Sequence, residues 1–428
     1  MFALVDCNNF YVSCERVFNP RLAGPVAVLS NNDGCIVARS QEVKDLGVPM
    51  GAAYFEYKEL FERHRVKIFS SNYTLYGDMS DRVMETLKTF TPDVQVYSVD
   101  EAFLFFSRTQ TKDQLLGIRK RIKQWTGIPV SIGMARTKTL AKMANYLAKK
   151  TQSGVVVLST DDEVRCALNE LPVEDIWGIG RQYSRLLRSK GIHSALQFRN
   201  AEDAWVRKHM SVVGLRTVWE LRRTSCLPLD ELPVAKKSVI CSKSFGYPID
   251  NFEELCEATA TYVARACEKI RAQDSLASYL SIFAVMHERQ DHYFPTYKNG
   301  ITLAEPTSYT PTLITAAKQL LRTIYRDGIR YRKTGVCLGG LIPRSQAQLD
   351  LFEGHGKLKE KQGKVMHIMD TLNAEYGKNG QHGKKALRSA AEGSPVPAWG
   401  MRRNMRSPAY TTNWNELLTV GSPDPTRA

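Results

Sequence analysis

The chain has 428 residues, of which 43% are hydrophobic and 24% charged, and a net charge of +15 at pH 7. This length exceeds one hydrophobic core, so two to four globular domains are expected. The positive charge indicates a polyanionic partner, and because no apolar run reaches the length of a membrane span, nucleic acid is favoured over a membrane surface.

The nine cysteines are scattered and form no CxxC pair. This pattern excludes a zinc module and a disulfide framework and is typical of reduced, intracellular thiols. The apolar N-terminus is short, lacks a basic leader and carries Asp6, so no signal peptide is expected.

Residues 1–160 are predicted to alternate between short strands and helices. The predicted strands are 1–6, 26–29, 35–38, 67–69, 94–96, 103–106, 128–134 and 154–158. The predicted helices are one through Cys14 and Val17, then 40–46, 76–90, 114–125 and 137–150. Residues 50–72 are otherwise mixed. The order resembles a split ferredoxin-like sheet with helices on one side, interrupted by residues 11–72.

An Asp-Glu pair, Asp100-Glu101, lies between two apolar, β-prone runs. Taken alone, such a pair is more often a solvated strand end than a site. Asp6, however, closes another apolar run, and a split sheet can place the first strand beside the central hairpin. Three carboxylates there would suit a two-metal phosphoryl-transfer site. Because adjacent residues of a regular strand face opposite sides, the chain must turn or bulge at this pair.

Residues 161–226 are predicted to be helical and basic. Within them, Gly178-Ile179-Gly180 precedes Arg181 and a helix that ends at Gly191. This pattern predicts a helix-hairpin-helix, in which glycines and a helix N-terminus grip a DNA phosphate. The alternative is an ordinary turn between two helices with a glycine cap.

A tether at residues 227–238 leads to a second αβ unit, 239–342. Its predicted strands are 239–241, 279–284 and 334–338, and its predicted helices are 253–271 and 312–326. Basic residues beside the strands, Lys243 among them, suit contacts to DNA phosphates, although a solvated basic face is the alternative. Residues 353–428 are predicted to be partly ordered at best. The segment Gln348, Leu349, Asp350, Leu351 and Phe352 suits docking into a groove on a partner, or is a loose turn.

Several long motifs, in the same order along the chain, resemble those of Y-family DNA polymerases. They are Asp6 with Phe10-Tyr11, Tyr97–Ala102, Gly133–Lys142, the hairpin at 178–180 and Ser242–Gly246. The chain is most similar to the UmuC subgroup, which comprises the catalytic subunit of bacterial DNA polymerase V and its plasmid-borne relatives. The subgroup's motifs are Asn31–Cys35, Ser70–Tyr73 and Ser407–Thr412.

The resemblance implies a multidomain α+β architecture. It comprises a palm (1–10 and 73–160), small fingers (11–72), a helix-hairpin-helix thumb (161–226), a linker (227–238), a little finger (239–342) and a C-terminal tail (343–428). Asp6, Asp100, Glu101 and the carbonyl of Cys7 would hold two Mg²⁺ ions. Tyr11 would be the steric gate that excludes a ribose 2′-OH. Without the resemblance, the sequence also allows Tyr11 to be an ordinary aromatic residue of the core.

Other site residues follow from the same resemblance. Lys138 would contact the triphosphate, and Tyr73 or Tyr76 would line the nucleotide pocket. Many family members carry Tyr and Arg on the fingers helix, whereas this chain has Gln41 and Lys44. Lys44 would supply positive charge but not the paired hydrogen bonds that an arginine makes to a phosphate. Gly178, Gly180, Arg181 and Lys243 would contact DNA, and Gln348, Leu349, Leu351 and Phe352 would bind the sliding clamp.

The expected activity is error-prone, template-directed synthesis past damaged bases in the SOS response, in the bacterial cytoplasm near the nucleoid. The expected partners are primer-template DNA, dNTP, the sliding clamp, a processed UmuD-type dimer and a recombinase filament of the RecA type, with no membrane. Two alternatives stay open: a non-catalytic DNA-binding protein, and a polymerase subunit that is inactive alone. Primer extension with Mg²⁺ separates them.

Overall fold

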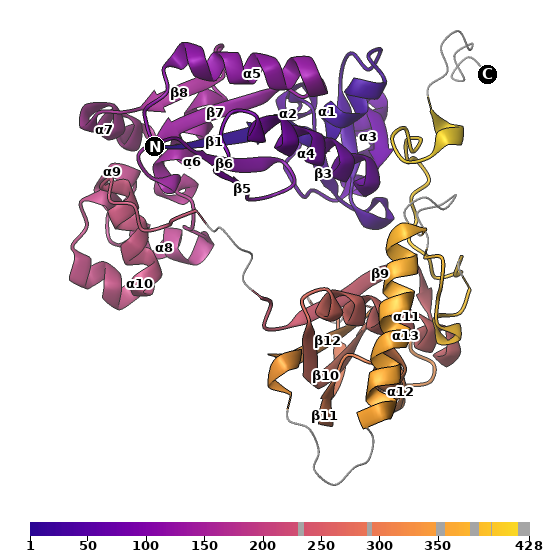
Figure 1. Cartoon of the computed structure of the whole chain (residues 1–428). Coiled ribbons are helices and arrows are strands. Elements are labelled where there is room, and N and C mark those ends of the chain that lie inside the picture. Colours follow the sequence, from indigo (N-terminus) through magenta and orange to yellow (C-terminus); the bar gives the residue numbers. More distant parts are fainter. Residues whose placement is uncertain (230–234, 289–292, 348–355, 377–384, 395, 418–428) are drawn as a thin grey trace.

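The computed structural model describes residues 1–229, 235–288, 293–347, 356–376, 385–394 and 396–417, with only the backbone of 356–359. The chain forms two units (Figure 1). We call residues 1–229 the N-terminal unit and the sheet and helices of residues 239–376 the C-terminal unit. They are joined by the chain that follows residue 229 and, on the other side, by residues 396–417.

The N-terminal unit is built on a five-stranded sheet with the order β5-β6-β1-β7-β8. Its strands are β1 (Phe2–Cys7), β5 (Val94–Val96), β6 (Glu101–Phe105), β7 (Val130–Ala135) and β8 (Val155–Leu158). Strand β1 is central and antiparallel to both β6 and β7, and it pairs Asp6 with Glu101. The predicted juxtaposition of the first strand and the central hairpin is therefore confirmed.

Helices cover both faces of this sheet, so the prediction of helices on one side is wrong. The helices are α4 (Tyr73–Lys88), α5 (Lys112–Thr126) and α6 (Lys138–Ala148). All six residues of β1 are buried, because Ala3 and Val5 pack with α4 and α5 while Phe2 and Leu4 pack with α6. Gly133 permits the close approach of α6, since a Cβ there would lie 2.0 Å from a backbone nitrogen of that helix.

A small three-stranded sheet, β3-β2-β4, is inserted after the first strand. Its elements are α1 (Phe10–Phe18), β2 (Val26–Leu29), β3 (Ile36–Arg39), α2 (Gln41–Asp45), α3 (Tyr54–Arg63) and β4 (Lys67–Ser70). Helix α3 was not predicted, because only Phe61 of its ten residues is fully buried and the apolar periodicity is weak. The three strands of this insertion match their predictions to within one residue at each end.

Four helices follow β8 and share a core with α6. They are α7 (Asp161–Glu170), α8 (Arg181–Ser189), α9 (Ala195–Arg199) and α10 (Asp203–Leu221). The predicted hairpin lies between a short 3-10 turn, Val173–Asp175, and α8. The helical character of residues 161–226 is confirmed.

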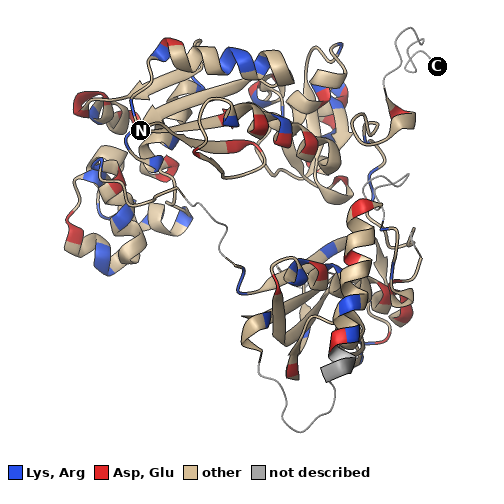
Figure 2. Cartoon of the chain, in the orientation of Figure 1, with Lys and Arg blue, Asp and Glu red and all other residues tan. Residues whose placement is uncertain are grey.

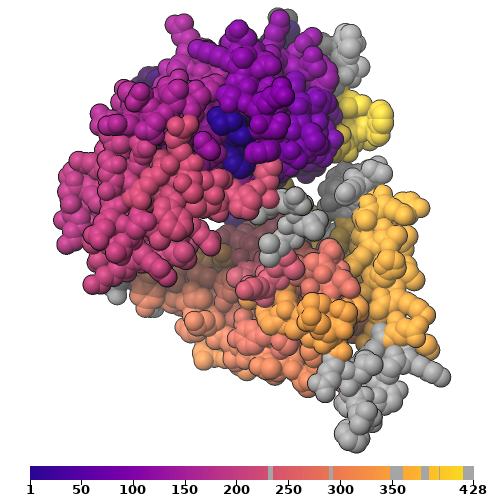
Figure 3. Space-filling model, turned by 60° about the vertical axis from the view of Figure 1, so that its left-hand side comes forward, coloured from indigo at the N-terminus to yellow at the C-terminus, as the bar shows by residue number. Residues whose placement is uncertain are grey.

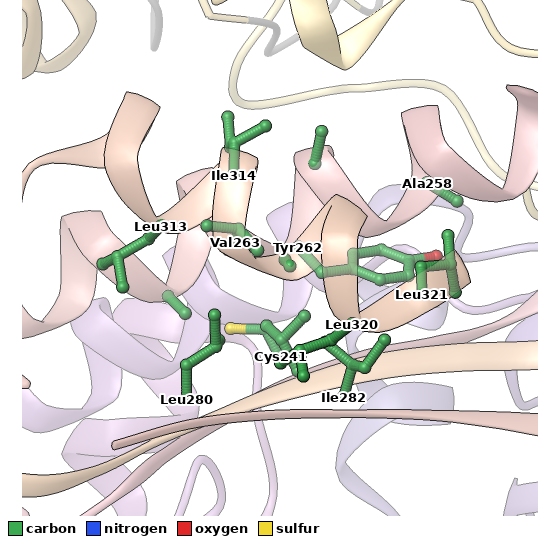
Figure 4. Close-up of a cluster of buried hydrophobic side chains, with 14 of the residues drawn as sticks. Cys241, Ala258, Tyr262, Val263, Leu280, Ile282, Leu313, Ile314, Leu320 and Leu321 are labelled. Carbon is green, nitrogen blue, oxygen red and sulfur yellow. The ribbon is translucent and has the colours of Figure 1, made fainter. Parts of the chain in front are cut away.

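The C-terminal unit is a four-stranded antiparallel sheet, β11-β10-β12-β9, with helices on one face. Its elements are β9 (Val239–Ile249), α11 (Phe252–Arg271), β10 (Ser275–Met286), β11 (Thr296–Thr307), α12 (Thr310–Ile324) and β12 (Tyr331–Pro343). Figure 4 shows the core, where Leu280 and Ile282 of the sheet lie beneath Val263 of α11 and Leu320 of α12. The mostly exposed strand β11 was not predicted.

The region after residue 353 contains more structure than predicted. Helix α13 (Gly356–Glu375) runs along α11, and Arg271 makes a bidentate ion pair with Asp370 at 2.6 and 2.8 Å. Farther on, Trp399 is 8% exposed and packs into the core of the C-terminal unit. The order in this region depends on docking against other elements, which its polar composition does not reveal.

Residues 396–417, here called the strap, cross from the C-terminal unit to the N-terminal unit. Trp399 accepts a backbone hydrogen bond from Gly246, whereas the Asn72 side chain donates to Ser407 and Pro408, and Tyr410 stacks on Phe18 at 4.9 Å. In Figure 3 the yellow end of the strap lies against the purple N-terminal unit. The strap is therefore a second connection between the units.

Glu15 anchors the strap inside the N-terminal unit. Its carboxylate is 1% exposed and accepts hydrogen bonds from Tyr76 Oη at 2.7 Å and Ser407 Oγ at 3.0 Å. Burial raises the pKa of Glu15 to about 6, and the two hydrogen bonds only partly offset this effect. The folded state therefore holds this proton more tightly than the unfolded chain does.

We expect this carboxyl to make folding less favourable as the pH rises. The stability that this carboxyl gives the folded state is fully present below pH 4.5 and is lost as the pH rises past 6. The free energy of unfolding changes by about 2 kcal/mol between these limits. Glu15→Gln should remove that part of the pH dependence, as measured by thermal unfolding between pH 4.5 and 7. The exposed Glu56→Gln is the control, and equal profiles for the two variants would contradict the assignment.

Candidate active site

Three carboxylates meet where β1 ends and β6 begins. Asp6 pairs with Glu101 across the two strands, and the amide of Cys7 donates to the carbonyl of Asp100 at 2.8 Å. Strand β6 starts only at Glu101, and residues 98–100 form a bend before it. The predicted departure from regular strand geometry at the Asp-Glu pair is thus confirmed.

The bend is held by hydrogen bonds of its own residues. The amides of Tyr97 and Ser98 both donate to the carbonyl of Glu101 at 3.0 Å, and Ser98 Oγ donates to Asp100 Oδ1 at 2.6 Å. These contacts fix the Asp100 carboxylate at the tip of the β5-β6 hairpin. Asp100 and Glu101 are both partly exposed, so a bound cation or substrate could reach them.

Lys142 of α6 and Lys149, the C-cap residue of that helix, pair with two of these carboxylates. Lys149 Nζ lies 2.7 Å from Asp6 Oδ2, and Lys142 Nζ lies 2.9 Å from Glu101 Oε2. The two lysines are seven residues apart, which places them two turns apart on the same helix face. Buried carboxylates need cations nearby, and here the ammonium groups provide them.

Asp6 is the most strongly perturbed carboxylate of the group. It is 7% exposed, and burial raises its pKa to about 7, against the lowering effect of Lys149 and with the help of Glu101. Because Asp6 binds its proton tightly, it loses that proton most readily when a divalent metal ion binds in the proton's place. Strongly perturbed pKa values of this kind are typical of functional sites.

The donor set fits a hard divalent cation. Carboxylate oxygens of Asp6, Asp100 and Glu101, with a backbone carbonyl nearby, are the ligands that Mg²⁺ prefers. The Cys7 thiol is buried and its pKa is raised, so only the carbonyl of this residue could serve. In the part of the chain that the structure describes, no three Asp, Glu, His or Cys side chains are already arranged as a metal cage. Asp6 and Glu101 instead pair with the two lysines, and Asp100 accepts a hydrogen bond from Ser98.

Three tyrosines lie beside the carboxylates. Tyr11 of α1 stacks on Tyr76 with ring centroids 4.3 Å apart, and Tyr73 meets Tyr11 edge-on at 6.1 Å. Tyr11 is near enough to Asp100 for that charge to help raise its pKa, after burial and Tyr73. Tyr76 is 1% exposed and bonded to Glu15, so it supports Tyr11 from behind, whereas Tyr73 is 44% exposed.

The inserted sheet contributes positive charge to the same region. Partial burial, Arg39 and Lys149 lower the pKa of Lys44, while Asp6 opposes them. Lys44 therefore lies close enough to Asp6 for the two charges to interact, while its predicted contact with the triphosphate stays a prediction. Nε and Nη1 of Arg39 are buried without a hydrogen-bond partner among the described residues. Gln41 instead donates to Asp45 at 2.8 Å within its own helix.

The structure does not bring Lys138 to the carboxylates. This lysine is 4% exposed at the start of α6, and its ammonium donates to Gln95 and to the carbonyl of Pro228. Its predicted contact with the triphosphate stays a prediction, and the carboxylates are contacted by Lys142 and Lys149, which the sequence analysis did not assign to the site. Their spacing of seven residues on a helix that begins after β7 was the available signal.

The remaining predicted contacts lie apart from this cluster. Gly178 has a φ of 93°, and Gly180 is the N-cap of α8 without a side-chain cap, so backbone amides are left for a ligand beside the exposed Arg181. Lys243 is exposed on β9. The predicted clamp-binding residues 349–352 lie outside the described part of the chain, as does Gln348.

Comparison with known families and proteins places these features in context. Residues 5–146 match the impB/mucB/samB family, residues 236–351 match the C-terminal domain of that family, and residues 363–420 match a domain of unknown function. The chain is 43% identical to Protein UmuC of Salmonella typhimurium, over 98% of this chain and 100% of that protein. It is 28% identical to DNA polymerase IV of Moorella thermoacetica, over 90% and 96% of the two chains.

Solved structures show the same fold. The Y-family DNA polymerase chimera Dbh-Dpo4-Dbh superposes with a TM-score of 0.64 at 20% identity, covering 80% of this chain and all of the chimera. An insertion ternary complex of Dbh DNA polymerase superposes with a TM-score of 0.52 at 20% identity, with the same coverage. In the part of the chain that the structure describes, every helix is too short or too polar to traverse a bilayer.

Proposed function

This chain belongs to the impB/mucB/samB family, the UmuC-type branch of the Y-family DNA polymerases, and we propose that it performs translesion synthesis by two-metal nucleotidyl transfer. It is a DNA-directed DNA polymerase. The observation that carries the mechanistic proposal is the juxtaposition of Asp6, Asp100 and Glu101 at a bend between two paired strands.

In this proposal the five-stranded sheet is the palm and the small inserted sheet is the fingers. Helices α7–α10 are the thumb, and the C-terminal sheet is the little finger. Asp6, Asp100, Glu101 and the Cys7 carbonyl would hold two Mg²⁺ ions. When bound, such ions lower the pKa of a primer 3′-OH and neutralise charge on the leaving pyrophosphate.

The protein's own side chains would bind and orient the nucleotide. Lys149 and Lys142 would be freed from the carboxylates as metal ions take their place, and Lys149 could then turn to the triphosphate. Lys44 and Arg39 face the same region and would supply positive charge from the fingers. Tyr11, supported by Tyr76, would close the sugar side of the pocket.

Small fingers support the translesion role. The inserted unit has three short strands, so it encloses little of a nascent base pair and shape selection is weak. The basic thumb and little finger would compensate by contacts to phosphates, which makes DNA binding sensitive to salt. The SOS role, the sliding clamp, a UmuD-type dimer and a recombinase filament belong to the proposal through the resemblance to UmuC-type proteins.

Primer extension tests the proposal most directly. With Mg²⁺, the full-length chain should extend a primer on undamaged and abasic templates, alone or after addition of a UmuD-type partner. DNA binding without extension in either condition would favour a non-catalytic DNA-binding protein instead.

The pH dependence of extension follows from the raised pKa of Asp6. Metal binding must displace its proton, so at limiting Mg²⁺ we expect activity to rise up to about pH 7 and then level off. Excess Mg²⁺ should restore activity at pH 6. Because Lys149 lowers this pKa, Lys149→Met should move the rise to higher pH. A rise that moved to lower pH in the variant would contradict the assignment.

A further inference from the structure

The upper end of the strap lies against the two helices that carry the tyrosines of the candidate site. Tyr11 belongs to α1, and Tyr73 and Tyr76 belong to the first turn of α4. In Figure 2 the strap carries blue positions where it runs between the lower and upper units. Its residues up to 420 lie within the match to a domain of unknown function. The contacts of the strap therefore bear on what that domain does.

A continuous series of hydrogen bonds leads from the strap to Tyr76. The side-chain nitrogen of Asn72 donates to Ser407 Oγ at 3.0 Å, and Ser407 Oγ donates to Glu15 Oε1 at 3.0 Å. Tyr76 Oη donates to the same carboxylate oxygen at 2.7 Å. All four side chains are buried. In such surroundings the hydrogen bonds of a chain strengthen one another, so a change at one end is felt along it.

The last ring of this series supports Tyr11. Tyr76 and Tyr11 are stacked, with ring centroids 4.3 Å apart and 15° between the planes. A shift of the Tyr76 ring would therefore open space behind Tyr11. Only two side chains, those of Glu15 and Tyr76, lie between the Ser407 hydroxyl and the ring of Tyr11.

The strap also fixes the start of α4. Asn72 is the N-cap of this helix, and its side-chain oxygen accepts from the amide of Leu75 at 3.4 Å. The nitrogen of the same side chain donates to the carbonyls of Ser407 and Pro408, both at 3.2 Å. The strap thus orients the amide group that caps the helix on which Tyr76 lies.

Contacts on both sides of Ser407 hold it opposite the carboxylate. Before it, the amide of Ser70 donates to the carbonyl of Met405 at 3.0 Å, and the amide of Met405 donates to Ser70 Oγ at 3.0 Å. These bonds add the strap to the end of β4, an edge strand of the small sheet. After it, Tyr410 stacks on Phe18, the last residue of α1, at 4.9 Å.

We propose that the strap positions the steric gate, with Ser407 as the positioning residue, and that this is a function of the C-terminal domain to which the strap belongs. The proposal rests on the proposed polymerase activity and on Tyr11 as the gate. Hydrogen bonds from Tyr76 and Ser407 are what lowers the pKa of Glu15 against the effect of burial. Without the Ser407 hydroxyl, this buried carboxylate loses one of the two donors and is driven to rearrange. Tyr76 then loses its fixed partner, and the support behind Tyr11 loosens.

The test measures sugar discrimination by the full-length protein, as the ratio of kcat/KM for a dNTP to kcat/KM for its ribonucleotide. Ser407→Ala removes the hydroxyl that donates to Glu15. Tyr76→Phe removes the hydroxyl on the other side of the carboxylate and keeps the stacked ring. Thr412→Ala, at an exposed position of the strap, is the matched control.

Ser407→Ala should lower the ratio about fivefold, with a change of less than about twofold in kcat/KM for the dNTP. Tyr76→Phe should lower the ratio by a similar factor. The two changes together should do no more than either alone, because they interrupt the same series. In a Tyr11→Ala background Ser407→Ala should have no further effect, since the strap acts through that ring. Thr412→Ala should keep the wild-type ratio.

An unchanged ratio in Ser407→Ala would overturn the proposal, as would a further loss in the Tyr11→Ala background, because the strap would then have only a structural role. If Ser407→Ala does not fold, Tyr410→Ala, which loosens the strap on the far side of Ser407, takes its place with the same expected fall.

Amide hydrogen exchange gives a second measurement that needs neither DNA nor nucleotide. The amides of α1 and of the first turn of α4 should exchange faster in Ser407→Ala than in Thr412→Ala. Exchange at the wild-type rate would overturn the role of the strap. A wild-type chain that extends no primer would instead contradict the polymerase activity, so the two failures are distinguishable.

Discussion

Replacing Glu101 with glutamine is expected to slow primer extension at least about 1000-fold, equivalent to about 4 kcal/mol of lost transition-state stabilisation. Glutamine keeps the size and hydrogen bonding of the side chain but removes the charge that holds a metal ion. In the structure that charge faces Lys142 at 2.9 Å and lies beside Asp6 in the neighbouring strand. Asp100→Asn should behave in the same way.

The affinity for primer-template DNA should change less than about twofold in both variants, because phosphate contacts elsewhere dominate it. Binding by fluorescence anisotropy and extension by gel electrophoresis separate the two effects. The matched control is Asp93→Asn, which removes an exposed carboxylate just before β5. Extension by Glu101→Gln at a near wild-type rate would show that the metal assignment is wrong.

The position of the three carboxylates could be predicted from sequence because it depends on a few strong local signals. Apolar runs that end in Asp6 and flank Asp100-Glu101 define two strands, and the order of elements makes them neighbours. The requirement for a bend followed from strand geometry alone, and the structure contains it at residues 98–100. A single sequence is most informative where a short motif determines the local backbone geometry.

Other parts of the site depend on contacts between distant segments. The role of Lys138 was inferred from the family resemblance alone, and the sequence does not show that its ammonium group is held by Gln95 and the carbonyl of Pro228. The strap was missed for a similar reason. Ser407 and Tyr410 lie in a polar stretch, and their contacts with Asn72 and Phe18 join residues more than 300 positions apart. Propensity and periodicity carry no information on such pairs.

Replacing Tyr11 with alanine is expected to reduce discrimination against ribonucleotides by about 100-fold. The ring of Tyr11 stacks on Tyr76 at 4.3 Å with an angle of 15° between the planes, so it cannot retreat from a 2′-OH. Tyr76 is itself fixed by its hydrogen bond to the buried Glu15 at 2.7 Å. The Tyr11 ring is therefore held in place by two side chains behind it, Tyr76 and Glu15.

The measurement is the ratio of catalytic efficiencies, kcat/KM, for a dNTP and its ribonucleotide. Tyr11→Phe keeps the ring and should keep the ratio, since the exclusion is steric. Tyr73→Ala, which removes the exposed edge-on neighbour, should lower dNTP affinity with little effect on sugar choice. An unchanged ratio in Tyr11→Ala would remove Tyr11 from this role. A ratio that fell in Tyr73→Ala alone would assign the gate to the more exposed ring.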